Sequence, residues 1–148
     1  MGTPFLKQFT VGWGDLDSNN HMRNTAYLDV AGTARFTFFK ENGFSPSRFR
    51  ELNFGPVVFK DEVEYMRELM LLETFTVNFL QDGMNQSGSV FRIMNEFFNP
   101  QGERVALVKT HGAWFDLAKR KIQPPPDELL AVMRSLPKTS TYAEITSR

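Results

Sequence analysis

The chain has 148 residues, which is enough for one domain with a sizeable hydrophobic core. It carries 17 Lys and Arg against 17 Asp and Glu, so it lacks the basic excess typical of nucleic-acid-binding proteins, and we expect no nucleic-acid partner. The absence of cysteine excludes disulfides, thiolate metal sites and a thiol nucleophile, and no apolar run approaches the roughly 20 residues that span a bilayer.

The first part of the chain is predicted to form a strand, a turn and a long helix. Residues 5–12 alternate in hydrophobicity as a half-buried strand does, and residues 15–24 are dense in the Asp, Asn and Ser typical of turns. Residues 25–42 place apolar side chains at helical spacing, with Asn24 or Thr25 available as the helix cap. Several residues on this helix are small, so we expect it to lie close against the centre of a curved sheet.

The middle of the chain is predicted to be mainly strands. Residues 46–53 form a loop or a short helical turn, and the segments that follow alternate in hydrophobicity. The tetrapeptide 99–102, Asn-Pro-Gln-Gly, is typical of a hairpin turn. The predicted strands are residues 55–65, 72–80, 89–99 and 103–117, with a turn over 82–88 between the second and the third.

The C-terminal part is predicted to add little to the sheet. Three prolines at 124–126 end the last strand, and Asp127 can cap a short helix. The last eleven residues carry little apolar surface, so we expect a loosely held tail. Residues 1–8 lack a basic segment followed by an apolar run, so we predict no signal peptide and expect a cytoplasmic protein with no membrane partner. The element order predicts an α+β domain.

The segment from Trp13 to Tyr27 gathers most of the polar groups that could carry chemistry. Its D-x-D-x-N run resembles the opening of a calcium-binding loop, but that loop needs Gly at position six and Glu at position twelve, where this chain has Asn20 and Ala26. We therefore expect no metal. A purely structural interpretation, a turn stabilised by its own Asp and Asn side chains, explains much of the segment.

A catalytic interpretation explains the segment as well. The first N–H groups of a helix are unpaired and carry partial positive charge, so they can hold a carbonyl oxygen that becomes negative during attack. A nearby carboxylate can attack that carbonyl or activate a water molecule. Asp17 lies on the turn just before the helix, and if the helix begins near residue 22, His21, Asn24 and Tyr27 follow one side of its start.

Residues 13–28, W-G-D-L-D-S-N-N-H-M-R-N-T-A-Y-L, resemble the signature of the hotdog-fold acyl-CoA thioesterases of the 4-hydroxybenzoyl-CoA thioesterase type. That signature reads [YFW]-x-D-x-D-x-x-G-H-x-N-N-x-x-Y and precedes a long central helix wrapped by a curved antiparallel sheet. The element order matches that fold over about residues 5–120. The resemblance implies a single hotdog domain over residues 1–148, with a C-terminal short helix and tail over 124–148.

The resemblance implies roles for individual residues. Asp17 corresponds to the catalytic carboxylate, acting as nucleophile or general base on the thioester carbonyl of an acyl-CoA. The backbone amides of Arg23 and Asn24 would polarise that carbonyl, and His21 and Tyr27 would order the loop and line the acyl site. No cofactor is implied, because coenzyme A is part of the substrate. The family also implies a homodimer or homotetramer with sites at subunit boundaries.

Two positions depart from the signature. Asn20 replaces the usual Gly, and Asn also tolerates a left-handed conformation, so the turn can survive. Arg23 replaces an Asn and could engage an anionic acyl group or pair with Asp15 or Asp17, and we favour the ion pair. Two other functions are possible on this fold, namely a dehydratase or hydratase of 3-hydroxyacyl thioesters, with His21 as the candidate base, and a non-catalytic acyl-binding protein.

Overall fold

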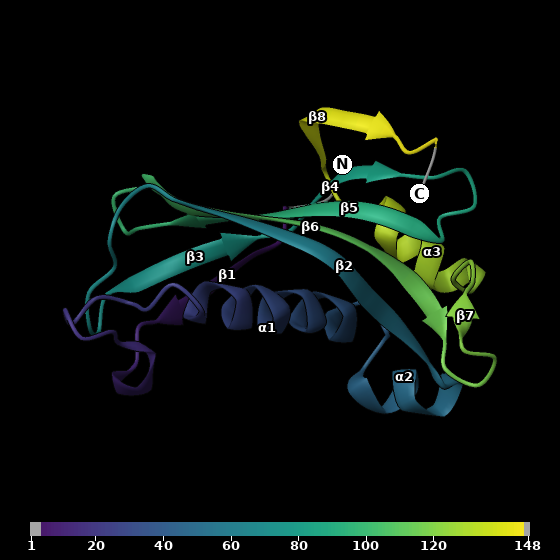
Figure 1. The fold of residues 1–148 in the computed structure, drawn as a ribbon, viewed down its shortest axis with the longest axis horizontal. Coiled ribbons are helices and arrows are strands. Elements are labelled where there is room, and N and C mark those ends of the chain that lie inside the picture. Colours follow the sequence, from purple (N-terminus) through teal and green to yellow (C-terminus); the bar gives the residue numbers. More distant parts are fainter. Residues whose placement is uncertain (1–3, 147–148) are drawn as a thin grey trace.

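A curved antiparallel sheet arches over one long helix, with two shorter helices at one end (Figure 1). The computed structural model describes residues 4–146, so the two ends of the predicted domain, 1–3 and 147–148, lie outside the described residues. The expected α+β architecture is confirmed. The elements are β1 (Leu6–Thr10), a 3-10 turn η1 (Trp13–Asp15), α1 (Ala26–Glu41), α2 (Pro46–Leu52), β2 (Phe54–Tyr65), β3 (Thr74–Asn78), β4 (Leu80–Met84), β5 (Val90–Phe98), β6 (Arg104–Asp116), β7 (Lys121–Ile122), α3 (Asp127–Arg134) and β8 (Lys138–Glu144).

Helix α1 forms where its apolar spacing predicts. Its small residues Ala31 and Ala34 are completely buried, which lets the helix axis lie close to the sheet as expected. Thr25 occupies the N-cap position, but its side chain makes no capping bond and instead accepts a hydrogen bond from Arg23 Nε at 3.0 Å. The helix ends at Glu41 with Asn42 as its C-cap, and the chain turns away through Gly43, whose φ of 91° is the left-handed conformation that glycine adopts most readily.

The sheet is built around the β5–β6 hairpin, which confirms the predicted turn at 99–102. Strands β3 and β4 pair with successive parts of β5, and β1 pairs with β3. On the other side of the hairpin, β2 pairs with β6 over its whole length. Within the described residues β2 has no further neighbour, so it forms one edge of the sheet.

Four sequence predictions in the second half of the chain are wrong, and two of them share a cause. The predicted strand 72–80 is two strands, β3 and β4, and Asp82 and Gly83 lie inside β4 rather than in a turn. The predicted tail instead forms β8, which pairs in parallel with β4. A Cβ on Gly83 would lie 2.6 Å from the carbonyl oxygen of Ala143, so only glycine admits this approach. The N-cap of α3 is Pro126, so Asp127 does not cap that helix.

The interior consists of two main apolar clusters. One surrounds the N-terminal half of α1, and the other, rich in phenylalanine, surrounds its C-terminal half together with α2 and α3. Between them lies a row of polar side chains, which we call the polar row: Arg35 of α1, Asp61 of β2, Asn95 of β5 and Thr110 of β6. Over residues 4–146, no helix has the length and apolar character needed to cross a membrane.

Candidate functional site

The predicted site segment forms a loop over residues 12–25, at the N-terminal end of α1 (Figure 1). We call it the Asp17 loop. Its backbone is joined to the segment 66–73, which connects β2 with β3. The Met22 amide donates to the Leu69 carbonyl at 2.8 Å, and His21 and Met70 form an isolated β-bridge. Asn20 adopts the left-handed conformation that the sequence predicted, with φ of 66°.

Asp17 lies exposed at the tip of this loop, and its carboxylate is held by the backbone. Oδ1 accepts hydrogen bonds from the amides of Asn19 at 2.8 Å and His21 at 3.0 Å. These bonds favour the ionised form and lower the pKa of Asp17 below its usual value of 3.8, and the bond from the His21 amide has the largest effect. The carboxylate is therefore charged at neutral pH, and both bonds are made to Oδ1, so neither of them occupies Oδ2.

Arg23 forms the favoured ion pair with Asp15 of the loop, and a second one with Asp29 of α1 that was not predicted, but none with Asp17. Its guanidinium lies 3.8 Å from Asp15 Oδ1 and 3.5 Å from Asp29 Oδ2, and it also donates to the Gly14 carbonyl. Asp15 supports the turn by accepting from the Gly12 amide at 3.1 Å. The Arg23 amide donates to the Asp15 carbonyl at 2.7 Å. This bond contradicts the expectation that the Arg23 amide polarises a substrate carbonyl, because the donor is already used.

Helix α1 begins at Ala26 with Thr25 as its N-cap, which agrees with the predicted helix over 25–42 but not with a start near residue 22, the condition of the catalytic interpretation. Asn24 therefore lies in the turn before the helix. Its carbonyl accepts a hydrogen bond from the Tyr65 hydroxyl at 2.8 Å, which ties the end of β2 to this turn. Among the described residues no partner is recorded for the Asn24 amide. Of the two amides expected to bind a carbonyl oxygen, this one remains available.

The two predicted acyl-site residues differ in exposure. His21 is partly exposed, and its Nε2 lies 3.1 Å from Glu68 Oε2 in the 66–73 segment. Tyr27 is 2% exposed and packs against the rings of Tyr65 and Phe97, both at 5.3 Å between centroids. Burial raises the pKa of Tyr27 to about 12, so the phenol stays neutral. In the single chain Tyr27 is a core residue that supports the loop from beneath, and it has almost no surface with which to contact a substrate.

This geometry, an anchored carboxylate in a loop before the central helix, agrees with the comparison with known families. Residues 11–133 match the Thioesterase-like superfamily. The chain belongs to this superfamily.

Solved structures place this thioesterase-like protein among hotdog folds. A protein of Aquifex aeolicus described as hypothetical is 22% identical, with a TM-score of 0.80 over 88% of this chain and 99% of that one. A Staphylococcus aureus protein, solved in complex with CoA, is 17% identical, with a TM-score of 0.82 over 93% and 89% of the two chains. The 1,4-dihydroxy-2-naphthoyl-CoA thioesterase of Synechocystis is 16% identical, with a TM-score of 0.79 over 90% and 98%. At these identities the likeness shows the hotdog fold.

Sequence reasoning missed the second half of the site in this thioesterase-like protein. Tyr65 and Glu68 contact Asn24 and His21 from far along the chain. The segment that carries Glu68 has no periodic pattern, and it joins the Asp17 loop through backbone bonds that any side chain permits. No signal in the sequence distinguishes these residues. The alternation that ends at Tyr65 marks only the end of a strand.

Proposed function

We propose that the protein hydrolyses acyl-CoA, or a related acyl thioester, to the free acid and the thiol, as a thioesterase of the 4-hydroxybenzoyl-CoA thioesterase type. The observation that carries the proposal is the Asp17 carboxylate, which is exposed, ionised and fixed through one oxygen by two backbone amides. Membership of the Thioesterase-like superfamily supports this reaction class. Neighbours named as CoA thioesterases share the fold and support it further.

Two routes use the same carboxylate. In the first, Oδ2 of Asp17 attacks the thioester carbon, the C–S bond breaks, the CoA thiolate leaves, and water then hydrolyses the mixed anhydride. In the second, Oδ2 takes a proton from a water molecule whose oxygen attacks the same carbon, and the resulting tetrahedral intermediate collapses as the C–S bond breaks and the CoA thiolate leaves. In both routes negative charge develops on the carbonyl oxygen. We assign its stabilisation to the Asn24 amide, assisted by the positive end of α1.

The proposed assembly is a cytoplasmic homodimer or homotetramer in which a partner subunit completes the acyl site. The edge of β2 supports this proposal, because the far side of the strand presents unpaired backbone groups that can pair with a second copy. Val58 and Tyr65 on this strand are exposed at 53% and 49%. Light scattering of the native chain and of Val58→Lys tests the assembly, and a native monomer would contradict it.

The test of the reaction is thiol release from a panel of acyl-CoAs. Asp17→Asn keeps an oxygen acceptor for the two loop amides but removes the reactive carboxylate, so we expect its rate on the best substrate to fall about 10²- to 10⁴-fold. Asp29→Asn is the matched control, because Asp29 is an exposed carboxylate beside the same helix start. Hydrolysis at the native rate by Asp17→Asn would contradict the mechanism.

A second candidate function is hydration of an enoyl thioester, favoured by one observation. His21 and Glu68 form the kind of histidine–acid pair that can move a proton, with 3.1 Å between Nε2 and Oε2. Addition of water to crotonyl-CoA, lost in both His21→Gln and Glu68→Gln, would support it. Tight binding of acyl-CoA without turnover of any thioester would instead indicate a non-catalytic acyl-binding protein.

A further inference from the structure

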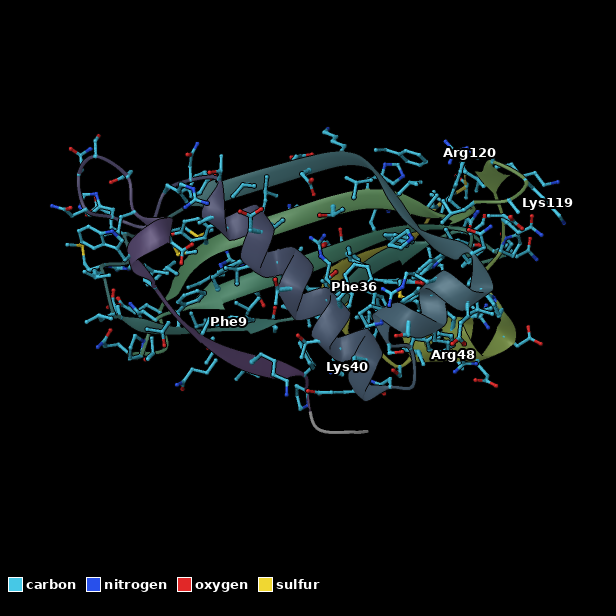
Figure 2. All side chains as sticks on the ribbon, turned by 90° about the horizontal axis from the view of Figure 1, so that it is seen from below. Phe9, Phe36, Lys40, Arg48, Lys119 and Arg120 are labelled. Carbon is cyan, nitrogen blue, oxygen red and sulfur yellow. The ribbon has the colours of Figure 1, made fainter. Side chains whose placement is uncertain are left out.

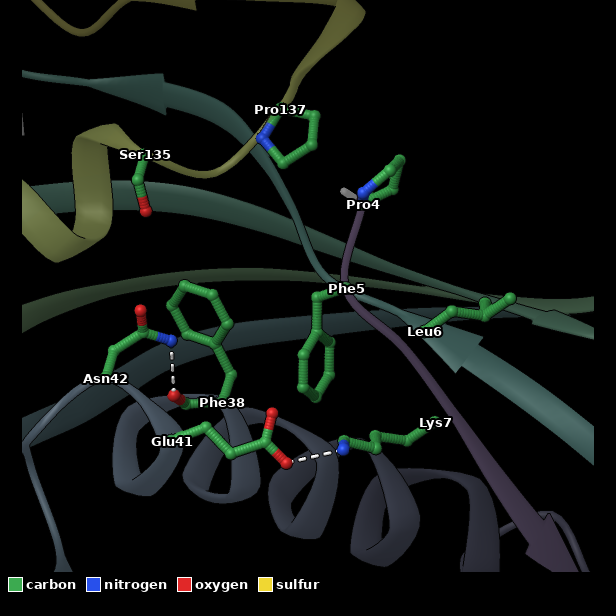
Figure 3. Close-up of a pocket in the computed structure, with 9 residues that line it drawn as sticks. All are labelled: Pro4, Phe5, Leu6, Lys7, Phe38, Glu41, Asn42, Ser135 and Pro137. Carbon is green, nitrogen blue, oxygen red and sulfur yellow. Dashed lines mark hydrogen bonds and ion pairs between the residues drawn. The ribbon is translucent and has the colours of Figure 1, made fainter. Parts of the chain in front are cut away.

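Two of the cavities near the C-terminal half of α1 differ in their electrostatics. The larger, of about 470 Å³, opens between the start of β1, the end of α1 and the segment after α3 (Figure 3). Its charged groups are paired, with Lys7 Nζ 2.5 Å from Glu41 Oε2. The smaller, of about 290 Å³, lies between α1 and the edge of the sheet. We call it the Arg35 pocket, and its wall includes Gly32, Arg35, Phe36, Val58, Thr110 and Trp114.

Most of the wall of the Arg35 pocket is apolar. Phe36 lies on the flank of α1 that faces α2 (Figure 2), where its ring is 5.8 Å from that of Phe49. Trp114 forms the floor and is completely buried among aromatic rings. A cavity of this size and lining suits one ring or a short chain, at the lower end of the range of ligand pockets. Apolar surface alone, however, does not explain the charged member of the wall.

Arg35 is a cation with neutral neighbours. Its Nε donates to Asn95 Oδ1 at 2.9 Å and its Nη2 to Thr110 Oγ1 at 2.7 Å, which uses two of the five N–H donors of a guanidinium. No carboxylate of residues 4–146 lies within ion-pair distance of it. The nearest countercharge is Asp61, which accepts from the Thr110 hydroxyl at 2.5 Å and so acts on Arg35 through that group.

The environment disfavours the charge on Arg35. Burial lowers the pKa of its guanidinium to about 10, against a smaller opposing effect of Asp61. Arg35 is partly buried, and a cation that loses part of its water shell without gaining a direct anion carries a desolvation cost. An oxygen acceptor placed in the pocket would give the guanidinium a further hydrogen bond. The pocket therefore combines an apolar volume with one charged donor group that has no direct ion-pair partner among the described residues.

We propose that the Arg35 pocket binds a compact apolar group that ends in an oxygen acceptor, with the Arg35 guanidinium bonding that oxygen. This chemistry has two sources. One is a free carboxylic acid, whose carboxylate faces Arg35. The other is the acyl part of an acyl-CoA with a distal oxygen, and for this source the inference rests on the proposed function. In either case the pocket favours such a group over a pure hydrocarbon, which would offer the guanidinium no acceptor and would displace water from it.

Binding of a free acid is measured by tryptophan fluorescence. The chain has two tryptophans, so Trp13→Phe leaves Trp114, in the pocket wall, as the sole reporter. Benzoate is the anionic probe and benzyl alcohol the uncharged probe with the same ring. We expect saturable binding of benzoate, weakened about tenfold or more by Arg35→Met, because bonds to charged groups are among the strongest. Arg35→Lys should retain part of the affinity.

The acyl-CoA source is tested by binding to the Asp17→Asn variant, so that hydrolysis does not enter the measurement. The probes are hexanoyl-CoA and 6-hydroxyhexanoyl-CoA. We expect tighter binding of the hydroxylated probe and loss of this preference in Arg35→Met. A preference that depends on Arg35, in a chain that hydrolyses no thioester, would leave this inference standing while the proposed function fails.

Gly32→Leu provides an independent variant, because a Cβ at Gly32 meets no atom within 4 Å and a larger side chain would enter the pocket. Gly32→Leu should abolish binding of whichever acceptor-bearing probe the native protein binds, whereas Gly32→Ala should leave that binding unchanged. Benzoate binding alone would identify a free acid as the ligand, and the acyl-CoA preference alone would identify the substrate. Absence of both, or binding that neither Arg35→Met nor Gly32→Leu weakens, would overturn the proposal.

Discussion

Replacement of Gly32 by alanine should stabilise the protein, because Gly32 lies in the middle of its longest helix. An Ala in a helix interior is favoured over Gly by about 1 kcal/mol, because Gly loses more backbone entropy on folding. At Gly32 the added Cβ meets open space, so no clash reduces this gain. For 148 residues, an unfolding entropy of about 2.1 cal/mol/K per residue gives roughly 0.3 kcal/mol/K. The expected rise in Tm is therefore about 3 °C.

The matched control is Gly43→Ala, which adds the same methyl group just after the same helix. Gly43 has φ of 91°, where a Cβ is strained, so this variant should lose about 1 kcal/mol or more. Thermal unfolding followed by circular dichroism, with urea titration at 25 °C, gives both changes. If Gly32→Ala lowers the free energy of unfolding, the helix face at Gly32 is not open in solution and the reasoning is refuted.

Three further predictions concern the loop, the start of the helix and the C-terminal strand. Because the folded-state pKa of Asp17 is lowered, its contribution to stability is present above about pH 4 and lost as the pH falls through the folded pKa, so Asp17→Asn should show a smaller loss of urea midpoint between pH 6 and pH 3. Tyr65→Phe removes the bond to the Asn24 carbonyl and should cost about 0.5–1 kcal/mol in the free energy of unfolding; an unchanged urea midpoint would show that the bond contributes nothing. Ile145→Ala should cost about 2 kcal/mol by the same titration, because Ile145 is 5% exposed, whereas a loosely held tail would show no change.

The parts of the fold that could be predicted are those with local causes. Helix α1 follows from apolar spacing within its own 16 residues and from Asn42-Gly43 at its end. The β5–β6 hairpin follows from Asn99, whose side chain accepts from the Gln101 and Glu103 amides within the turn itself. These interactions join residues that are close in sequence, so the sequence of a single chain is enough to predict them.

The misread C-terminal region has a distant cause. Asp82-Gly83 is a common turn sequence, but here Asp82 accepts from the hydroxyls of Thr139 at 2.5 Å and Thr141 at 2.6 Å. The pair therefore serves as the docking position for β8. Because β8 lies more than fifty residues further along the chain, the sequence Asp82-Gly83 by itself indicates a turn and gives no sign of the strand pairing. The polar appearance of the last residues then suggested a tail.

The candidate site was predictable in part for the same reason. The turn, the left-handed Asn20 and the Arg23–Asp15 ion pair arise within the Asp17 loop and agree with its sequence. The helix start was predicted by the apolar spacing and the cap at Thr25, whereas the alternative start near residue 22 fails, because the residues before Ala26 bond to Asp15 and Tyr65 instead of beginning the helix. The burial of Tyr27 likewise depends on Tyr65, which the sequence places on a separate strand.

The polar row also bears on how the protein moves. It lies between two apolar clusters that meet at Phe5, which packs against both, while the buried residues of each cluster are otherwise distinct, so most contacts of one cluster do not depend on the other. Partial opening can then be confined to one end of the molecule. Amide hydrogen exchange reports such openings, and residues around Phe97 would form one protection class while those around Trp114 form another. The site loop at one end could thus fluctuate, as substrate entry requires, without loosening the aromatic cluster at the other.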